Sequence, residues 1–278
     1  MDRQRLTITL RKDLLKEVDE AIDGAKIRNR SHAIEYLLTQ ALRPTVERAV
    51  ILAGGKGVQM RPFTYEMPKT MLPVGGRPIL EYAVERLRKA GVRNITIVIG
   101  HLGEKIRDHF GDGSAFGVRI DYFEQQGETI GTAYPLTQIR TLQKGNPFFV
   151  MYGDTLADID LQDLFETHDS TGAIMTAALT SVEQPGSFGV ASLRGYKIVR
   201  FDEKPGVGKS RTHLVSAGVF VCSPGIVNVI PKKKTASIEK DVLPHLAGEG
   251  LITGYPFEGR WYDVGTPEIY EKVIQEWV

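Results

Sequence analysis

The chain has 278 residues, of which 42% are hydrophobic and 25% charged, and its formal net charge is +1. These values are ordinary for a globular protein, and the near-zero charge excludes a chain that binds nucleic acid over its whole surface. Cys222 is the single cysteine, so the sequence excludes an intrachain disulfide and favours a cytoplasmic location. No apolar stretch approaches the roughly 20 residues of a membrane-spanning helix, so we expect none.

The first 43 residues predict a small unit of one strand and two helices. Residues 5–10 (RLTITL) alternate apolar and polar side chains, which is typical of a strand. A helical pattern follows and ends at Gly24, and Ser31 could cap a second helix. A unit of this size cannot bury a sufficient core alone, and a single strand leaves its backbone groups unpaired. We therefore expect two chains to pair here.

This strand–helix–helix plan resembles the ribbon-helix-helix family of DNA-binding dimers, in which a two-stranded ribbon enters the major groove. The resemblance implies that Arg5, Thr7 and Thr9 face base edges, and that backbone N–H groups near Ser31 hold a phosphate. It also implies a homodimer, or a dimer of dimers, formed through residues 1–43. The same unit could act only as a dimerisation module with its polar face in solvent, and the sequence leaves both possibilities open.

Residues 44–48 are expected to link this unit to a domain that spans residues 49–278. The domain opens on an apolar run at residues 49–53, typical of a buried strand, and GGKG follows directly. Glycine lets a ligand approach the backbone N–H groups, and cationic side chains of the same loop would bind phosphate. These cationic side chains are Lys56, Arg61 and Lys69. The pattern favours a nucleoside triphosphate site, although a strand-to-loop turn without a ligand has the same glycines.

A larger set of motifs resembles the sugar-1-phosphate nucleotidylyltransferases, the enzymes that make NDP-sugars. LAGGKG, PKxxLPVGGRP and a following helix stand in the family's order, and the resemblance extends from about Arg48 to the C-terminus. It implies an α/β fold with a Rossmann-like (GT-A-like), mostly parallel sheet, which the alternating strand and helix patterns also indicate. It further implies transfer of a nucleotidyl group from an NTP to a sugar 1-phosphate, with Mg²⁺ as the cofactor and pyrophosphate as the second product.

The first loop departs from the family pattern at one position. The family's GxGTRLxP is GKGVQMRP here, so Gln59 stands where the family has an arginine that binds the triphosphate. Loss of a charged donor aimed at a transition state lowers a rate by about 10²–10³-fold, although Arg61 could replace it in part. The alternative to an enzyme is therefore a catalytically weak sensor of NDP-sugars or nucleotides that regulates transcription.

The resemblance implies a nucleotide site built from the first loop and from residues 125–133 (QQGETIGTA). By spacing, Gln126 matches the glutamine of the family's base-recognition segment, although Gln125 is one position away. The amide offers a donor and an acceptor to a base edge, and Gly131 would let the base lie flat on the backbone. The expected nucleotide-binding residues are Leu52, Ala53, Gly54, Gly55, Gln126, Gly131 and Thr132.

An apolar run at residues 148–152 (FFVMY) predicts a central strand that ends just before Asp154. A carboxylate at the tip of a buried strand must be paired, hydrated or bound to a metal. The resemblance implies that Asp154 is the first Mg²⁺ ligand and that Asp263, in WYDVGTPEIY, is the second. The expected catalytic residues are Lys69, Arg61, Gln59 and Asp154.

FDEKP at residues 201–205 resembles the family's Glu-Lys-Pro motif, although a surface charge pair has the same pattern. The resemblance implies that Glu203 accepts hydrogen bonds from sugar hydroxyls and that Lys204 holds the sugar phosphate. Ser216 stands where many relatives have asparagine. The expected sugar-phosphate site consists of Gly189, Glu203, Lys204 and Ser216.

Other polar residues have structural explanations. Asp160 is expected to cap the helix LQDLFETH, and the helix dipole explains His168 near the C-terminus of that helix. Glu239 and Asp241, in SIEKD, are expected only to cap or to pair.

Overall fold

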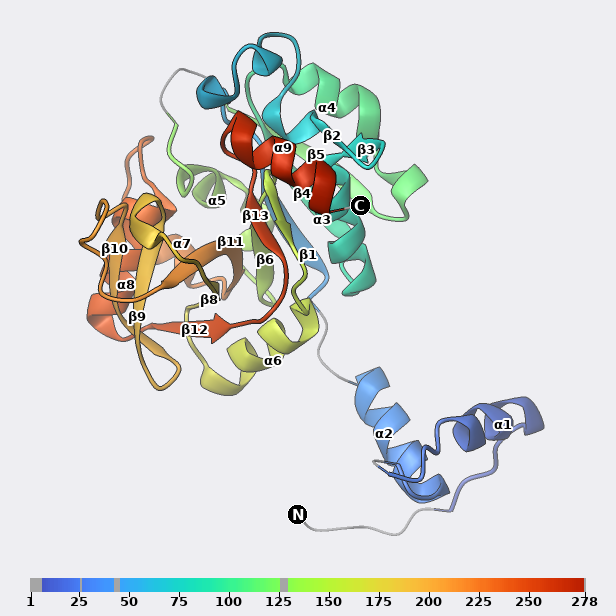
Figure 1. The fold of residues 1–278 in the computed structure, drawn as a ribbon. Helices are drawn as coiled ribbons and strands as arrows, with labels where there is room; N and C mark the ends of the chain where they lie inside the picture. The colour runs from blue at the N-terminus through green and yellow to red at the C-terminus, as the bar shows by residue number, and fades with distance from the viewer. Residues whose placement is uncertain (1–6, 26, 43–45, 126–129, 278) are drawn as a thin grey trace. The chain divides into compact units, whose positions relative to one another are not determined.

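The computed structural model describes the chain apart from residues 1–6, 26, 43–45, 126–129 and 278 and the side chains of residues 39–42. The chain divides into two compact units, Met1–Thr45 and Val46–Val278, and the division falls within the linker expected at residues 44–48. The predictions for Arg5 and Gln126 lie outside the described residues. Figure 1 shows the elements of each unit.

The N-terminal unit has two helices, α1 (Lys12–Glu20) and α2 (Arg30–Leu42). Its small buried core consists of Val18, Ile27 and Ala33. Residues 7–10, the described part of the predicted strand, form no strand within the single chain. A strand that pairs only with a second copy would leave this segment unpaired in one chain, so the ribbon stays a prediction.

Two polar contacts fix the second helix. The carboxylate of Asp19 accepts two hydrogen bonds from the guanidinium of Arg30, at 2.6 and 2.7 Å, and so ties α1 to α2. The side chain of Asn29 accepts from the backbone N–H of His32 at 2.9 Å, which is the geometry of a helix N-cap. The prediction that Ser31 caps this helix is wrong, because α2 begins one residue before it.

The larger unit is built on a nine-stranded sheet in the order β5-β4-β1-β6-β11-β8-β12-β10-β9. The bounds of these strands are, in that order, Arg119–Glu124, Asn94–Ile99, Arg48–Leu52, Phe148–Tyr152, Leu214–Cys222, Met175–Ser181, Ile252–Pro256, Lys197–Glu203 and Gly189–Arg194. Strands β5, β4, β1 and β6 run parallel, and β12 is parallel to β8. The remaining neighbours pair antiparallel, so the sheet is mixed.

The prediction of a mostly parallel sheet is thus confirmed only for the half formed by β5, β4, β1 and β6. In the other half, only Gly195 and Tyr196 separate β9 from β10. A connection that short permits only an antiparallel hairpin, because parallel neighbours need a crossover of a dozen or more residues.

Helices cover both faces of the sheet (Figure 1). Their bounds are α3 Ile79–Lys89, α4 Gly103–Phe110, α5 Tyr134–Gln138, α6 Leu161–Thr171, α7 Ile226–Val229, α8 Leu243–Glu249 and α9 Pro267–Glu276. The apolar sides of α3, α4 and α6 join one core, and those of α5, α7 and α8 join the other. In β1, Ala49 and Ile51 enter the first core and Val50 the second. Burial on both faces explains why such strands are continuous apolar runs.

Two small ribbons lie outside the main sheet. β2 (Pro73–Val74) pairs with β3 (Arg77–Pro78), and β7 (Thr155–Ala157) pairs with β13 (Trp261–Asp263). A third core links them to α9 and consists of Met60, Leu72, Val74, Ile79, Leu156, Val264, Tyr270, Val273 and Trp277. Among the described residues, every helix is too short or too polar to cross a membrane.

Helix α6 tests two local predictions. The side chain of Asp160 accepts from the N–H of Gln162 at 2.8 Å, so its role as the N-cap is confirmed. His168 is only 2% exposed, and its ring lies 3.0 Å from the hydroxyl of Thr176 and 3.0 Å from that of Ser223. Burial lowers the pKa of His168 to about 4. The helix-dipole explanation is wrong, because a helix C-terminus favours a protonated ring.

Candidate active site

The carboxyl ends of β1 and β6 place the glycine loop beside Asp154. Leu52 and Tyr152 are register partners at these ends, and the N–H of Gly153 donates to the carbonyl of Leu52 at 2.9 Å. Residues 53–57 leave β1 at this point. Ligands of open α/β sheets bind outside the carboxyl ends of parallel strands, so this edge is the expected place for a site.

The ribbon of β7 and β13 brings Asp263 to the same edge. Asp263 is the register partner of Thr155 in this antiparallel pair. The N–H of Val264 donates to the carbonyl of Asp154 at 3.0 Å, which extends the pairing by one step. Two carboxylates that lie far apart in the sequence therefore meet beside the glycine loop.

The two carboxylates repel each other, and two nearby lysines offset this repulsion only in part. Lys69 forms an ion pair with Asp154, and the two side chains are only 18% and 20% exposed. Burial lowers the pKa of Lys69, but attraction to Asp154 outweighs burial and raises that pKa overall. Burial and the nearby charge of Asp154 raise the pKa of Asp263 to about 6, although Lys69 and Lys204 oppose the rise. A divalent cation would offset the repulsion that remains despite these two lysines.

The donor set suits a cation that arrives with a phosphate ligand. Within the described part of the chain, no group of three or more His, Cys, Asp or Glu side chains could hold a metal ion. Mg²⁺ typically takes one or two carboxylates and completes its shell with phosphate oxygens and water. Asp154 and Asp263, beside a loop that offers backbone N–H groups, match this requirement.

A cavity of about 510 Å³ lies at the glycine loop and the two carboxylates. Of the predicted nucleotide-binding and catalytic residues, its lining includes Leu52, Ala53, Gly54, Gly55, Gln59, Lys69, Thr132 and Asp154. Gln125 also lines it, and its amide packs on Gly54 so closely that a Cβ there would lie 2.2 Å from the Gln125 Oε1. Gln125 therefore lies at the cavity, whereas the predicted Gln126 is outside the described residues.

Two predicted residues lie outside this lining. Arg61 is exposed, and its guanidinium lies over the ring of Tyr65, 5.1 Å from the ring centre. Gly131 instead packs on the backbone of Ala236, where a Cβ on the glycine would lie 2.0 Å from the carbonyl oxygen. The charge of Arg61 therefore lies over Tyr65 and outside the cavity lining, whereas Gly131 is needed for the close approach of two backbone segments.

A smaller cavity of about 120 Å³ is lined by the residues predicted to bind the sugar phosphate. Those residues are Gly189, Glu203, Lys204 and Ser216. Lys204 and Asp263 line both cavities, so the two open onto the same residues. Lys204 has φ = +47°, a conformation that costs a residue with a Cβ about 1–3 kcal/mol and that proteins retain mainly at functional sites. Burial, and then the charge of Glu239, raise the pKa of Glu203.

The sequence prediction missed Glu239 as a site residue. Its carboxylate accepts a hydrogen bond from Thr132 at 2.8 Å and further bonds from Tyr152 and Ser237, and it lines both cavities. The only sequence signal was a serine two residues before it, which is also a capping pattern. Ser237 does cap this turn, because its side chain accepts from the N–H of Lys240. Only the fold shows that three separate segments meet at one carboxylate.

The parallel strands, the glycine loop and the two adjoining cavities place the larger unit in the class of α/β proteins with a ligand site at the carboxyl edge of the sheet. Residues 48–277 match the sequence model of the family described as nucleotidyl transferase, and the chain belongs to this family. The predicted resemblance is confirmed for these residues, and the match does not cover the ribbon-helix-helix prediction.

Two relatives illustrate the family. A UTP–glucose-1-phosphate uridylyltransferase from Synechocystis sp. is 34% identical over 245 residues, which cover 82% of this chain and 62% of that protein. A mannose-1-phosphate guanylyltransferase catalytic subunit beta from Danio rerio is 35% identical over 226 residues, which cover 80% of this chain and 62% of that protein. The chain therefore spans less than two thirds of the length of these relatives.

A solved structure is similar over most of the larger unit. A putative glucose-1-phosphate thymidylyltransferase from Bacillus anthracis superposes with a TM-score of 0.75 at 26% sequence identity. The similarity covers 82% of this chain and 93% of that chain. The nucleotidyltransferase fold is thus confirmed.

Proposed function

We propose that the larger unit transfers a nucleotidyl group from an NTP to a sugar 1-phosphate and releases pyrophosphate. The observation that carries the proposal is the convergence of Asp154 and Asp263 beside residues 53–57, where two cavities share lining residues. The larger cavity suits a nucleotide and the smaller one a sugar. The names of the relatives describe uridylyl and guanylyl transfer involving glucose 1-phosphate and mannose 1-phosphate.

In this reaction, a sugar-phosphate oxygen forms a bond to the α-phosphorus of the NTP as the bond from that phosphorus to pyrophosphate breaks. The reaction needs no protein nucleophile, so positioning and charge account for catalysis. Backbone N–H groups of residues 54–55 and the ammonium of Lys69 would bind the nucleotide phosphates, and Lys204 would hold the sugar phosphate. Asp154 and Asp263 would hold Mg²⁺, which when bound offsets the charge of both phosphates.

One observation favours a second candidate, a catalytically weak sensor of nucleotides or NDP-sugars. Gln59 lines the nucleotide cavity without a charge, and Arg61 lies outside the lining, over Tyr65. A site that binds the triphosphate but stabilises the leaving pyrophosphate poorly would bind its ligands without fast turnover.

Pyrophosphate release separates the two candidates. It is measured for each of the four NTPs, and for dTTP, against a panel of sugar 1-phosphates. The enzyme proposal expects turnover that depends on Mg²⁺ with at least one pair. No turnover with any pair, together with a raised unfolding temperature in an NDP-sugar, would favour the sensor, because a ligand of the folded state stabilises it by mass action.

We also propose that residues 1–43 form a homodimer, or a dimer of dimers. The described part of this unit exposes five large apolar side chains: Ile8 (45%), Leu14 (39%), Tyr36 (44%), Leu37 (37%) and Leu38 (50%). Large apolar side chains left in water favour association, and a second copy offers the same side chains in return.

DNA binding by this dimer is the finer part of the proposal. Thr7 and Thr9 are exposed, and the first turn of α2 includes Ser31 with an exposed side chain. Fluorescence anisotropy of the full chain on random and genomic fragments tests it, and the affinity should fall steeply with salt. An absence of binding at low salt would rule out the DNA-binding role and leave dimerisation as the only proposed role of residues 1–43. We propose that the protein acts in the cytoplasm, because NTPs are available there.

A further inference from the structure

The β7–β13 ribbon carries a charged cluster at the end opposite the two site carboxylates. At one end Thr155 pairs with Asp263, and at the other the N–H of Asp158 donates to the carbonyl of Arg260 at 2.8 Å. Gly259 approaches so closely that a Cβ there would lie 2.4 Å from the carbonyl oxygen of Asp158. The ladder between the two ends has only three residue pairs. A ribbon this short is weak by itself, so its register depends on what holds its ends.

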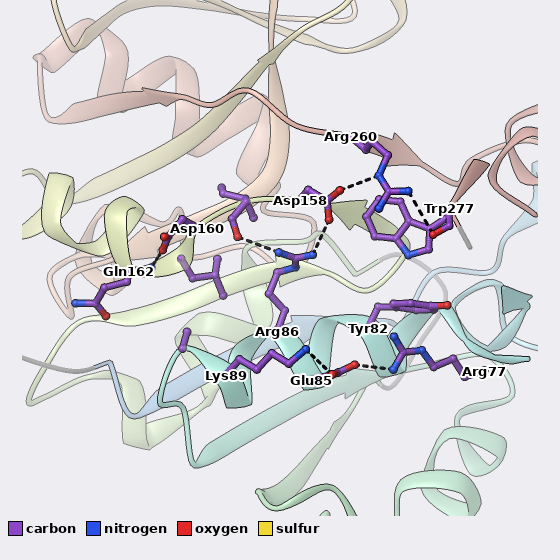
Figure 2. A pocket seen from close by; sticks show the side chains of 13 residues that line it. Arg77, Tyr82, Glu85, Arg86, Lys89, Asp158, Asp160, Gln162, Arg260 and Trp277 are labelled. Atoms are coloured by element: carbon purple, nitrogen blue, oxygen red, sulfur yellow. Dashed lines mark hydrogen bonds and ion pairs between the residues drawn. The ribbon is translucent and has the colours of Figure 1, made fainter. Parts of the chain in front are cut away.

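Asp158 lies between two arginines from different elements (Figure 2). Arg86 of α3 lies 3.2 Å from one carboxylate oxygen, and Arg260, which directly precedes β13, donates to the other at 2.8 Å. Arg86 also donates to the carbonyl of Ile159 at 3.0 Å, and Arg260 donates to that of Glu276 at 2.9 Å. The cluster of Asp158, Arg86 and Arg260 therefore ties the ribbon to α3 and to the end of α9.

This cluster lines a surface hollow of about 600 Å³ and is not part of the apolar core. The side chains of Asp158, Arg86 and Arg260 are 39%, 29% and 49% exposed. The guanidinium of Arg260 also lies over the ring of Trp277, 4.6 Å from its centre. An exposed ion pair contributes only about 0–1 kcal/mol to stability, so fixed geometry is the larger contribution of such a network.

We infer that the Asp158 cluster positions the active site by fixing the register of the ribbon, and thereby the separation of Asp154 and Asp263. None of its three members lines either cavity of the site, so they act through the ribbon and not on a ligand. The inference rests on the proposed function in one respect, that Asp154 and Asp263 hold a divalent cation.

Mn²⁺ binding to the full chain in the presence of an NTP and without sugar phosphate tests the inference. It is measured by electron paramagnetic resonance against a blank of Mn²⁺ and NTP alone, because the two carboxylates suit a cation that arrives with a phosphate ligand. We expect Asp158→Asn and Arg260→Gln each to raise the Kd for Mn²⁺ about fivefold or more, because support around a metal site typically changes affinity by about 10–100-fold. The matched control is Glu85→Gln. It removes the ion pairs to Arg77 and Lys89 in the same hollow, but it removes no contact to the β7–β13 ribbon. Its Kd should stay within about twofold of wild type.

Thermal unfolding in the same buffer separates positioning from stability. If Asp158→Asn and Arg260→Gln unfold earlier but bind Mn²⁺ as wild type does, the cluster only stabilises the fold and the inference is wrong. The double variant should bind no more weakly than the weaker single variant, because both changes break one unit. Arg260→Lys keeps the charge but cannot donate to both Asp158 and the carbonyl of Glu276, so its Kd for Mn²⁺ should lie between those of wild type and Arg260→Gln. If Arg260→Gln does not fold, Arg260→Lys takes its place in the test.

Failure of this inference and failure of the proposed function are distinguishable. A wild-type chain that releases no pyrophosphate, yet shows the expected Mn²⁺ contrast among the variants, would refute the reaction and keep the positioning role. A wild-type chain that turns over its substrates without binding Mn²⁺ in the presence of NTP would remove the metal role of Asp154 and Asp263, and the inference with it.

Discussion

At the residue scale, Asp154 and Asp263 share Lys69 in the half-buried lining of the larger cavity. We predict that Asp154→Asn and Asp263→Asn each lower pyrophosphate release by at least about 10²-fold, because each removes a charge that holds the cation. The unfolding temperature of Asp263→Asn should not fall, since the change also removes a charge that Asp154 repels. A pyrophosphate assay and thermal unfolding check both expectations, and undiminished turnover in either variant would contradict the metal assignment.

Gln59 is the second residue that decides how active the site is. We predict that Gln59→Arg raises kcat by about 10-fold or more, because it places a charged donor in the lining where pyrophosphate must leave. The matched control is Arg61→Gln, which should change kcat by less than about twofold, since Arg61 lies outside the lining. If Arg61→Gln abolishes turnover and Gln59→Arg has no effect, Arg61 supplies the missing charge in the working enzyme.

At the scale of elements, His168 makes the packing of α6 depend on pH. Its folded pKa of about 4 lies below the usual value of 6.5, because the ring is buried neutral between Thr176 and Ser223. The unfolded chain therefore binds the proton first. The contribution of His168 to stability is complete above about pH 6.5 and is lost as the pH falls towards 4, by about 3 kcal/mol in all.

Urea unfolding at pH 7 and pH 4 measures this loss. His168→Gln, which cannot be protonated, should lose about 3 kcal/mol less than wild type between the two pH values. His213 is exposed and serves as the control position, because His213→Gln should show the wild-type pH dependence. Equal pH dependence in wild type and His168→Gln would show that His168 has the same pKa in the folded and unfolded chain, and would contradict the prediction.

The sequence predicted those elements whose signal is local. β1 and β6 are apolar runs buried on both faces, so their composition alone predicted them and the position of Asp154. β9, β10 and β11 run antiparallel to their neighbours because of short connections and of the strands beside them. The alternation of strands and helices in the sequence does not reveal this. Glu239 binds hydroxyls from three segments, and nothing near it in the sequence distinguishes that carboxylate from a cap. Glu239 was therefore missed, whereas Asp263 was found through its resemblance to a family motif and not through a local pattern.

At the scale of the whole molecule, the chain joins a unit that belongs to the nucleotidyl transferase family to a smaller unit outside that match. Within its described residues, the smaller unit buries Val18, Ile27 and Ala33 and leaves larger apolar side chains in water. A core of this size is too small for independent stability, so association is the physical route by which such a unit becomes stable.

We predict that the full chain is at least a dimer at micromolar concentration and that Leu38→Glu makes it a monomer, because a charge placed in an apolar contact would be buried without a partner. Val207→Glu is the matched control: Val207 is 95% exposed in the larger unit, so this variant should keep the wild-type mass in light scattering.

Both cavities are lined only by residues of Val46–Val278, so Leu38→Glu should retain pyrophosphate release within about twofold. DNA binding should fall in Leu38→Glu, because a two-stranded ribbon needs a strand from each chain. A wild-type monomer would contradict the prediction, and a dimer that survives Leu38→Glu would place the contact on another surface.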